Sequence, residues 1–273
     1  MANYRDTPSP ECVRGFYDTN EALTIIGAMA NVFPRWTNFL ILKIAVCVAT
    51  LAAGVIAFFV YYATPEAQRV GYQPTQPIPF SHVVHAGQLG MDCRYCHSFV
   101  EESGHANVPS ANTCWNCHQH VKTDSPKLEP LRRSVDKNYA EYTGEPVEWV
   151  RIHKSPDYVK FNHSAHVNRG VSCVSCHGRV DQMEVVYQAE SHTMGWCLDC
   201  HRAPENHIRP LEEVTNLDFD AEDYLKTEAG KELLANAKEI GYEASIRNQE
   251  ELGAFLRSQW SIGPKESCFA CHR

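Results

Sequence analysis

The longest apolar run in the chain lies near the N-terminus. Residues 38–62 carry Lys43 as their only charge, and the 19 residues from Ile44 to Tyr62 carry none. Because a helix of about 20 apolar residues spans a bilayer, this run predicts one transmembrane helix, with Trp36 at one interface. Its length and the lack of a small-residue cleavage site after it favour a retained membrane anchor over a cleaved signal peptide.

Basic residues are unevenly distributed around this run, and they predict its orientation. Four precede or begin it and one follows soon after, namely Arg5, Arg14, Arg35, Lys43 and then Arg69. Basic residues gather on the cytoplasmic side of membrane helices. We therefore expect a single-pass protein of the cytoplasmic (inner) membrane, with residues 1–37 as a cytoplasmic or interfacial segment. The Pro-rich residues 63–79 should form an extended linker, and residues 80–273 a periplasmic domain.

Helical periodicity returns in residues 218–262. Asp220 is a candidate N-cap for a helix that would end at Gly241, and Asn248 with Glu251 has the spacing of a capping box that begins a second helix. No long alternation of apolar and polar residues indicates a strand. The sequence therefore predicts a mainly α and irregular fold.

Composition and charge narrow the function. The formal net charge of -8 argues against a nucleic-acid partner, because phosphate binding needs a basic surface. The 12 cysteines are well above ordinary usage, and ten of them fall into five Cys-x-x-Cys-His motifs.

The five motifs are numbered here in chain order. Motif 1 is Cys93, Cys96 and His97; motif 2 is Cys114, Cys117 and His118; motif 3 is Cys173, Cys176 and His177; motif 4 is Cys197, Cys200 and His201; motif 5 is Cys268, Cys271 and His272. Two thiols at this spacing reach the two vinyl groups of one haem, and the adjacent imidazole ligates its iron. We therefore predict five covalently bound c-type haems, which are attached outside the cytoplasm. Disulfides and zinc ribbons are poorer explanations, because neither needs a histidine after every cysteine pair.

An internal repeat surrounds the first four motifs. Phe80-Ser81-His82-Val83-Val84-His85 precedes motifs 1 and 2, and Phe161-Asn162-His163-Ser164-Ala165-His166 precedes motifs 3 and 4. This similarity predicts two copies of one supersecondary unit, residues 80–120 and 161–204. The helical segment 218–262 and motif 5, at 268–272, follow the second copy.

The Phe-x-His-x-x-His pattern before Cys-x-x-Cys-His resembles the class III multihaem cytochromes c. In that family the first His is the sixth ligand of the haem next in sequence, and the second His ligates a different haem. The resemblance implies that His82 serves the iron of motif 1 and His163 that of motif 3, with His85 and His166 reaching other haems. Haems that share ligand segments in this way lie at the close range that rapid electron transfer needs.

Five irons need five distal ligands, and this assignment supplies four. Three residues between motifs 3 and 4 are candidates for the fifth position, namely Met183, Met194 and His192. A thioether ligand would raise the potential of that haem relative to haems with two imidazoles. Histidines such as His153 are better explained as surface or propionate-bonding residues.

Several longer stretches resemble the pentahaem cytochrome c subunit of bacterial alternative complex III, a quinol-oxidising respiratory assembly. They include Phe33-Pro34-Arg35-Trp36, Val70-Gly71-Tyr72-Gln73-Pro74, residues 88–97, residues 148–154 and Met194-Gly195-Trp196-Cys197. The resemblance implies an electron-transfer subunit without a substrate site of its own. It further implies iron-sulfur and integral membrane subunits as partners, and a cytochrome c or a terminal oxidase as acceptor.

Two other functions are compatible with the motifs. One is a membrane-anchored quinol dehydrogenase that feeds a periplasmic reductase, although such proteins typically have four haems. The other is a multihaem reductase of a small oxyanion, which needs one iron with an open position. The histidines and methionines outside the motifs are numerous enough to fill every such position.

Overall fold

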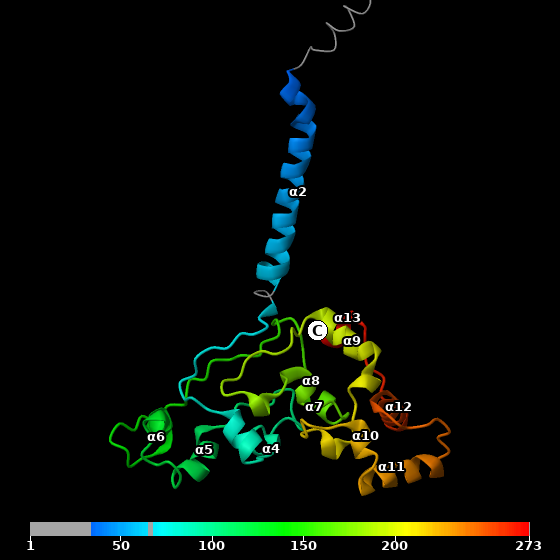
Figure 1. The fold of residues 1–273 in the computed structure, drawn as a ribbon. Coiled ribbons are helices and arrows are strands. Elements are labelled where there is room, and N and C mark those ends of the chain that lie inside the picture. Colours follow the sequence, from blue (N-terminus) through cyan, green and yellow to red (C-terminus); the bar gives the residue numbers. More distant parts are fainter. Residues whose placement is uncertain (1–33, 65–67, 273) are drawn as a thin grey trace, which may run out of the picture. The chain divides into compact units, whose positions relative to one another are not determined.

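The computed structural model describes residues 34–64 and 68–272, and the chain divides into two compact units, 1–64 and 65–273. In the first unit one continuous helix runs from Trp36 to Ala63, and it is long and apolar enough to cross a membrane. At 1.5 Å per residue it is about 42 Å long. Its central part is α2, Leu40–Phe58, which has no buried residue (Figure 1).

The predicted membrane run is thus one helix, with short turns at its two ends. The 3-10 turn η1, Arg35–Phe39, precedes α2, and the π turn η2, Phe59–Ala63, follows it. The prediction for the N-terminal segment, including Arg5 and Arg14, falls outside the described residues. The orientation across the membrane stays a prediction.

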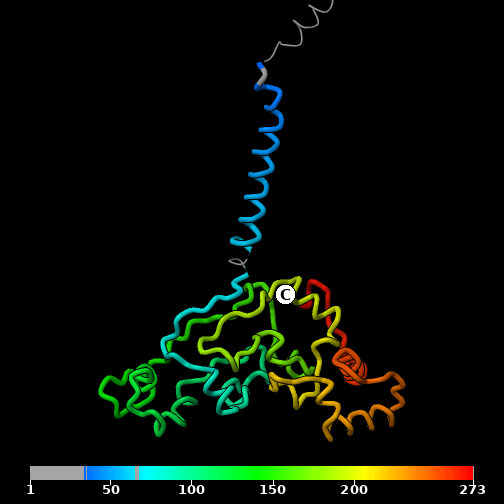
Figure 2. The backbone as a smooth tube through the Cα atoms, in the orientation of Figure 1, coloured from blue at the N-terminus to red at the C-terminus, as the bar shows by residue number. Residues whose placement is uncertain are grey.

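The second unit consists of short helices joined by irregular segments, with no strand among its described residues apart from the isolated bridge between Val171 and Ile208. This arrangement confirms the predicted mainly α and irregular fold (Figure 2). The helices are η3 (Val83–Gln88), α4 (Cys93–Cys96), α5 (Ala111–His118), η4 (Pro126–Leu128), α6 (Glu129–Val135), α7 (His163–Val167), α8 (Val174–His177), η5 (Val180–Gln182), α9 (Met194–Arg202), η6 (Pro204–Asn206), η7 (Leu211–Glu213), α10 (Ala221–Tyr224), α11 (Glu228–Glu239), α12 (Gln249–Gln259) and α13 (Cys268–Cys271).

Side-chain caps define where several of these short helices begin. The Asp92 carboxylate accepts a hydrogen bond from the Arg94 backbone N–H at the start of α4, and the Asn162 side chain accepts from Ala165 at the start of α7. Thr193 caps α9 in the same way. Such caps satisfy backbone donors that a helix of one or two turns leaves free. They therefore fix where α4, α7 and α9 begin, the helices that carry motif 1, the histidines of the second repeat and motif 4.

The C-terminal helices form a conventional apolar core. Leu252, Phe255 and Leu256 of α12 are almost fully buried, and they pack with residues of α10, α11 and the segment around Ile208. The predicted caps at Asp220 and Asn248 are confirmed, because both side chains accept a backbone hydrogen bond three residues later.

The prediction of one helix from Asp220 to Gly241 was wrong, because α10 and α11 are separate. Thr227 interrupts the helical run, since its hydroxyl accepts a hydrogen bond from the Gly230 N–H and so begins a new helix. Gly230 also lies directly against the backbone of Tyr224 and Leu225, where a larger residue would overlap it. The tight corner between α10 and α11 thus depends on this pair of residues.

The Pro-rich segment after residue 70 is extended, as predicted, but it is held along its length. The Gly71 N–H donates to the Gln188 carbonyl at 2.8 Å, and the Gln188 N–H donates to the Tyr72 carbonyl at 3.1 Å. The Gln76 side chain makes two hydrogen bonds with the backbone of Val150. This segment is therefore part of the second unit.

Candidate functional site

Each motif forms a short helix that presents its two cysteines one turn apart and places its histidine at the end of that turn. The motifs lie on α4, α5, α8, α9 and α13 in chain order (Figure 1). All eleven cysteines in the described part of the chain are free thiols. Within residues 34–64 and 68–272 no three His, Cys, Asp or Glu side chains are grouped so as to hold a metal ion.

The histidines of the repeat lie opposite the histidines of the motifs. The ring centroids are 6.2 Å apart for His85 and His118, and 6.1 Å apart for His166 and His201. Two imidazoles on opposite sides of one metal ion should have centroids about 6.2 Å apart, from two bonds of about 2 Å and about 1.1 Å within each ring. The observed separations fit an iron between each pair.

The third pair has the same spacing. His163 and His177 have parallel rings, 6.4 Å apart with an interplanar angle of 7°. His82 lies near His97, and the pKa of His82 is lowered to about 4 by burial first and then by the neighbouring His97 and His85. The Nδ1 atom of His82 is buried without a hydrogen-bond partner. The first His of each repeat thus accompanies the first motif of its unit, and the second His accompanies the second motif.

Hydrogen bonds at Nδ1 orient most of these rings. In seven of them Nδ1 lies within hydrogen-bond distance of a backbone carbonyl oxygen, at 2.7 to 3.2 Å: His85, His97, His118, His163, His166, His201 and His272. A metal-binding histidine commonly donates one ring N–H in this way and uses the other nitrogen as the ligand. The Nε2 atoms of these seven rings are therefore the ones available to iron.

Burial keeps several of these imidazoles neutral. It lowers the pKa of His163 and of His166 below the ordinary value, and it lowers the pKa of His177 strongly. Because neutral imidazole is the form that binds metal, these shifts favour ligation at neutral pH.

The two repeats place their phenylalanines identically. The Phe80 ring meets His82 edge-on at 4.8 Å and stacks on His85 at 4.4 Å. Phe161 meets His163 edge-on at 4.8 Å and stacks on His166 at 4.6 Å. Each phenylalanine thus separates the two histidines of its repeat by a fixed distance. The structure therefore repeats with the sequence.

His153 is a site residue that the sequence analysis assigned to the surface. Its Nε2 lies 3.4 Å from Nδ1 of His177, and the two ring centroids are 4.4 Å apart. It therefore takes the place that a backbone carbonyl has at other motifs. Its position 24 residues before His177 gave no local signal of this contact.

Comparison with known proteins decides the family. No protein-family model matches the sequence. The multihaem cytochrome c subunit of a menaquinone reductase from Nitratidesulfovibrio vulgaris (strain Hildenborough) is 32% identical over 172 residues, which cover 55% of this chain and 77% of that protein. The chain belongs to this family of multihaem cytochrome c subunits.

As a multihaem cytochrome c, the protein attaches c-type haem covalently. Its repeats leave space for such groups, because few apolar side chains in residues 80–204 are buried, Leu131 and Met183 being those below a tenth exposed. The paired imidazoles and the cysteines one turn apart fit haem at motifs 1 to 4. When bound, haem supplies reversible one-electron chemistry, and the histidines fix its plane.

The three candidates for a fifth distal ligand lie in different surroundings. Met183 is 4% exposed and packs beside Gly178, next to motif 3. His192 has a φ of 49°, and its Nε2 lies 2.9 Å from the Cys176 carbonyl oxygen. Met194 begins α9 and is 68% exposed. None of the three is hydrogen-bonded to His272, whose Nδ1 lies near the Tyr158 carbonyl oxygen.

Motif 5 makes two contacts with the segment from Tyr158 to Lys160. The Lys160 N–H donates to the Cys271 carbonyl at 2.7 Å, and the His272 ring lies 5.6 Å from the Tyr158 ring. This last motif therefore contacts the residues that immediately precede the second repeat.

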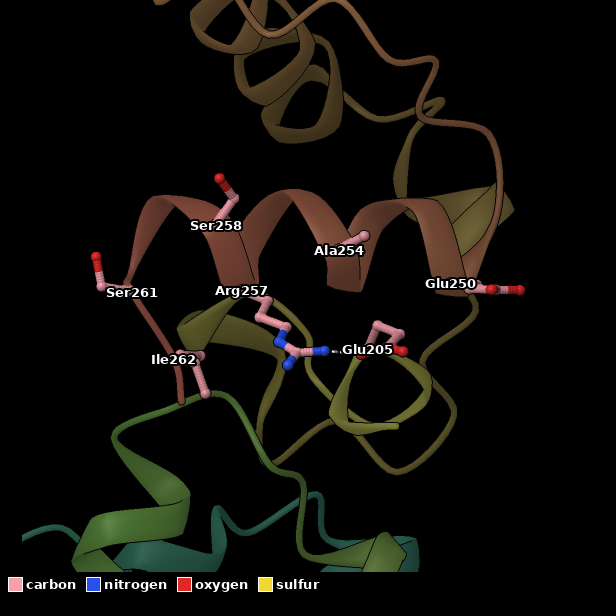
Figure 3. A pocket seen from close by; sticks show the side chains of 7 residues that line it. All are labelled: Glu205, Glu250, Ala254, Arg257, Ser258, Ser261 and Ile262. Carbon is pink, nitrogen blue, oxygen red and sulfur yellow. Dashed lines mark hydrogen bonds and ion pairs between the residues drawn. The ribbon is translucent and has the colours of Figure 1, made fainter. Parts of the chain in front are cut away.

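A separate surface cavity of about 420 Å³ lies beside α12. Figure 3 shows its lining, in which Arg257 reaches across to Glu205 at 2.8 Å. No motif residue lines this cavity, so it has no part in the haem sites.

Proposed function

We propose that this multihaem cytochrome is the electron-transfer subunit of a quinone-linked membrane complex and carries five haems. The observation that supports transfer rather than catalysis is the pairing of histidines at motifs 1 to 4. Each pair would hold one iron from both sides, which would leave these irons no position for a substrate.

Within this proposal the ligand pairs are His82 with His97, His85 with His118, His163 with His177, and His166 with His201. The fifth iron has His272 on one side. Of the three candidates for its other side, Met194 is favoured because it stands on α9, whose Cys197 neighbours Cys271 of motif 5. Met183 is buried beside motif 3, and His192 is engaged there by the Cys176 carbonyl.

The finer proposal is a complex of the alternative complex III type. In it electrons arrive from an iron-sulfur subunit and leave to a cytochrome c or a terminal oxidase. The cytochrome is anchored in the cytoplasmic membrane by residues 38–62, with its N-terminus in the cytoplasm and its haems in the periplasm. The relative is named for menaquinone reduction, the opposite direction. A haem chain has no direction of its own, so the potentials of the partners decide which way electrons run.

A second candidate function has one observation in its favour. Among the described residues no histidine ring lies opposite that of His272 as His85 lies opposite His118, and the aromatic ring beside it is that of Tyr158. An open fifth iron would make the protein a reductase of a small oxyanion.

The test is to purify the native complex and measure three properties. The mass of this subunit should exceed that of the bare chain by five haems, co-purifying proteins should include an iron-sulfur subunit, and menaquinol should reduce all the haems. Cys114→Ala/Cys117→Ala should leave four haems, while Cys47→Ala, a cysteine of α2 outside the motifs, should leave five. A subunit without haem, or one that quinol cannot reduce, contradicts the proposal.

The fifth ligand is tested by spectroscopy. Low-spin iron at every haem, unchanged by added nitrite or cyanide, is expected for pure electron transfer. Met194→His should lower one potential, because imidazole replaces a thioether. Met183→His serves as the control and should leave that potential unchanged. A high-spin haem that binds nitrite supports the reductase instead.

A further inference from the structure

The order of the motifs in space differs from their order along the chain. The first neighbours are motifs 1 and 2. The thiol of Cys96 lies close enough to the thiols of Cys114 and Cys117 for electrostatic interaction. In Figure 1, α5 and α4 follow one another along one side of the second unit.

Motif 1 also adjoins motif 3, which joins the two repeats. The thiols of Cys93 and Cys173 lie against each other, and this contact is the largest influence on the pKa of both. Backbone contacts support the junction. His163 donates its N–H to the Gly104 carbonyl at 3.3 Å, and Ser164 donates to Ser103 at 3.1 Å.

Motif 3 continues to motif 4. Burial and the thiols of Cys200 and Cys197 raise the pKa of Cys176 to about 12. The ring of His192, which contacts the Cys176 carbonyl, lies 5.1 Å from the Trp196 ring of α9. Motifs 3 and 4 are therefore side by side.

Motif 4 in turn adjoins motif 5. Burial and the nearby Cys271 raise the pKa of Cys197. The Nδ1 atom of His201 lies 2.8 Å from the Lys265 carbonyl oxygen, and Arg202 pairs with Glu266 at 3.4 Å. The segment before motif 5 thus packs on the end of α9, and Figure 1 shows α13 beside α9.

We propose that the haems form one line in the order of motifs 2, 1, 3, 4 and 5, so that electrons enter and leave through the haems of motifs 2 and 5. This inference rests on the proposed function and assigns its path. Each cysteine pair is attached to the vinyl edge of its haem, so neighbouring pairs bring haem edges together. The haem of motif 1, first in the chain, then has an internal place in the line.

The exposure of the cysteines supports the same two ends. Of the ten motif cysteines only Cys117 and Cys268 are exposed, and they belong to motifs 2 and 5. Phe269, inside motif 5, is 83% exposed. A partner can therefore approach these two haems closely, whereas the cysteines of motifs 1, 3 and 4 are all half-buried.

The direct test is a density map of the wild-type complex in which each iron is placed. The two irons nearest to that of motif 1 should be those of motifs 2 and 3, and the nearest to that of motif 5 should be that of motif 4. Any other set of nearest neighbours overturns the order. Such a map leaves the proposed function untouched, since quinol can still reduce all the haems.

A kinetic test uses variants that lack one haem. With electrons supplied by the native quinol-linked subunits, Cys173→Ala/Cys176→Ala should split the remaining four haems, two reduced at the wild-type rate and two far more slowly. A small chemical reductant should reduce all four in this variant. Two other variants each lack a haem at one end of the line, namely Cys114→Ala/Cys117→Ala and Cys268→Ala/Cys271→Ala. In each of them the remaining four haems should be reduced together. Their reduction should be slow in the variant that lacks the haem that receives electrons and rapid in the other. A split in either end variant, or none in the central one, refutes the order.

Discussion

Gly253 is the position at which one added methyl group has the clearest structural consequence. It lies in α12 with its backbone against η6, and an added Cβ would overlap the carbonyl oxygen of Glu205. It would also lie only 2.6 and 2.7 Å from the carbonyl carbon and Cα of that residue. Since these are backbone atoms, no side-chain rotation relieves the overlap. In Gly253→Ala the helix must therefore move away from η6.

Two opposing effects set the magnitude. Replacing glycine by alanine inside a helix stabilises it by about 0.5–1 kcal/mol when space is available. Overpacking against fixed atoms costs about 1–3 kcal/mol. Moving α12 also weakens the hydrogen bonds from the Gln249 side chain to the carbonyls of Glu205 and Ile208, at 3.1 and 2.7 Å. We expect a net loss of about 1–3 kcal/mol in the free energy of unfolding.

The assay is thermal unfolding of the haem-loaded protein, followed by far-UV circular dichroism. A loss of this size in a unit of this length lowers Tm by roughly 2–12 °C. Gly263→Ala is the matched control, because no atom lies within 4 Å of its added Cβ, and its Tm should stay near that of the wild type. If Gly253→Ala unfolds at or above the wild-type Tm, α12 does not pack on η6 as described.

Three further predictions concern the core, acid stability and haem tuning. Phe255→Ala should lower the free energy of unfolding in urea by about 3–5 kcal/mol, since the Phe255 side chain is 1% exposed. Leu211→Ala should lower it far less, because Leu211 is 46% exposed. Equal losses in the two variants would contradict the described core around Phe255. Hydrogen bonds from the Arg94 side chain lower the pKa of Asp92 to about 2. The ionised Asp92 carboxylate therefore stabilises the folded state above about pH 4, and this stabilisation is lost as the pH falls towards 2. Because the Asp92 side chain is 42% exposed, we expect it to contribute at most about 1 kcal/mol to the free energy of unfolding. In Asp92→Asn the free energy of unfolding should depend less on pH in that range. His153→Ala should alter the potential of the motif 3 haem alone in a redox titration, and a uniform change in all haems would argue against its contact with His177.

Much of the fold could be predicted from local sequence patterns. The apolar run predicted the helix from Trp36 to Ala63, and the caps at Asp220 and Asn248 were readable because a cap depends on residues three apart. The same reasoning failed at Thr227, because a continuous helical pattern hid a second cap inside it.

The sequence predicted which cysteines and histidines form the candidate site better than it predicted how they are arranged in space. The resemblance to class III cytochromes implied that His82 and His163 accompany motifs 1 and 3, and it left open which haems His85 and His166 serve. The structure brings these two rings to 6.2 and 6.1 Å from those of His118 and His201. Three of the seven contacts that orient the rings come from residues far away in the sequence. His163 contacts Gly104, 59 residues earlier, and His201 contacts Lys265, 64 residues later. No local pattern encodes such contacts, so neither they nor the neighbours of each motif could be read from the sequence.

The carbonyl acceptors at Nδ1 affect how this protein can diverge. A carbonyl oxygen is supplied by every residue type, so Asn107, Val121 or Lys265 can be replaced without removing the acceptor that their backbone provides. Natural variation can therefore change the side chains around these imidazoles without changing their orientation, because the orientation depends on backbone carbonyl groups. At His177 the acceptor is a side chain instead, and there a single codon change is enough to release the ring.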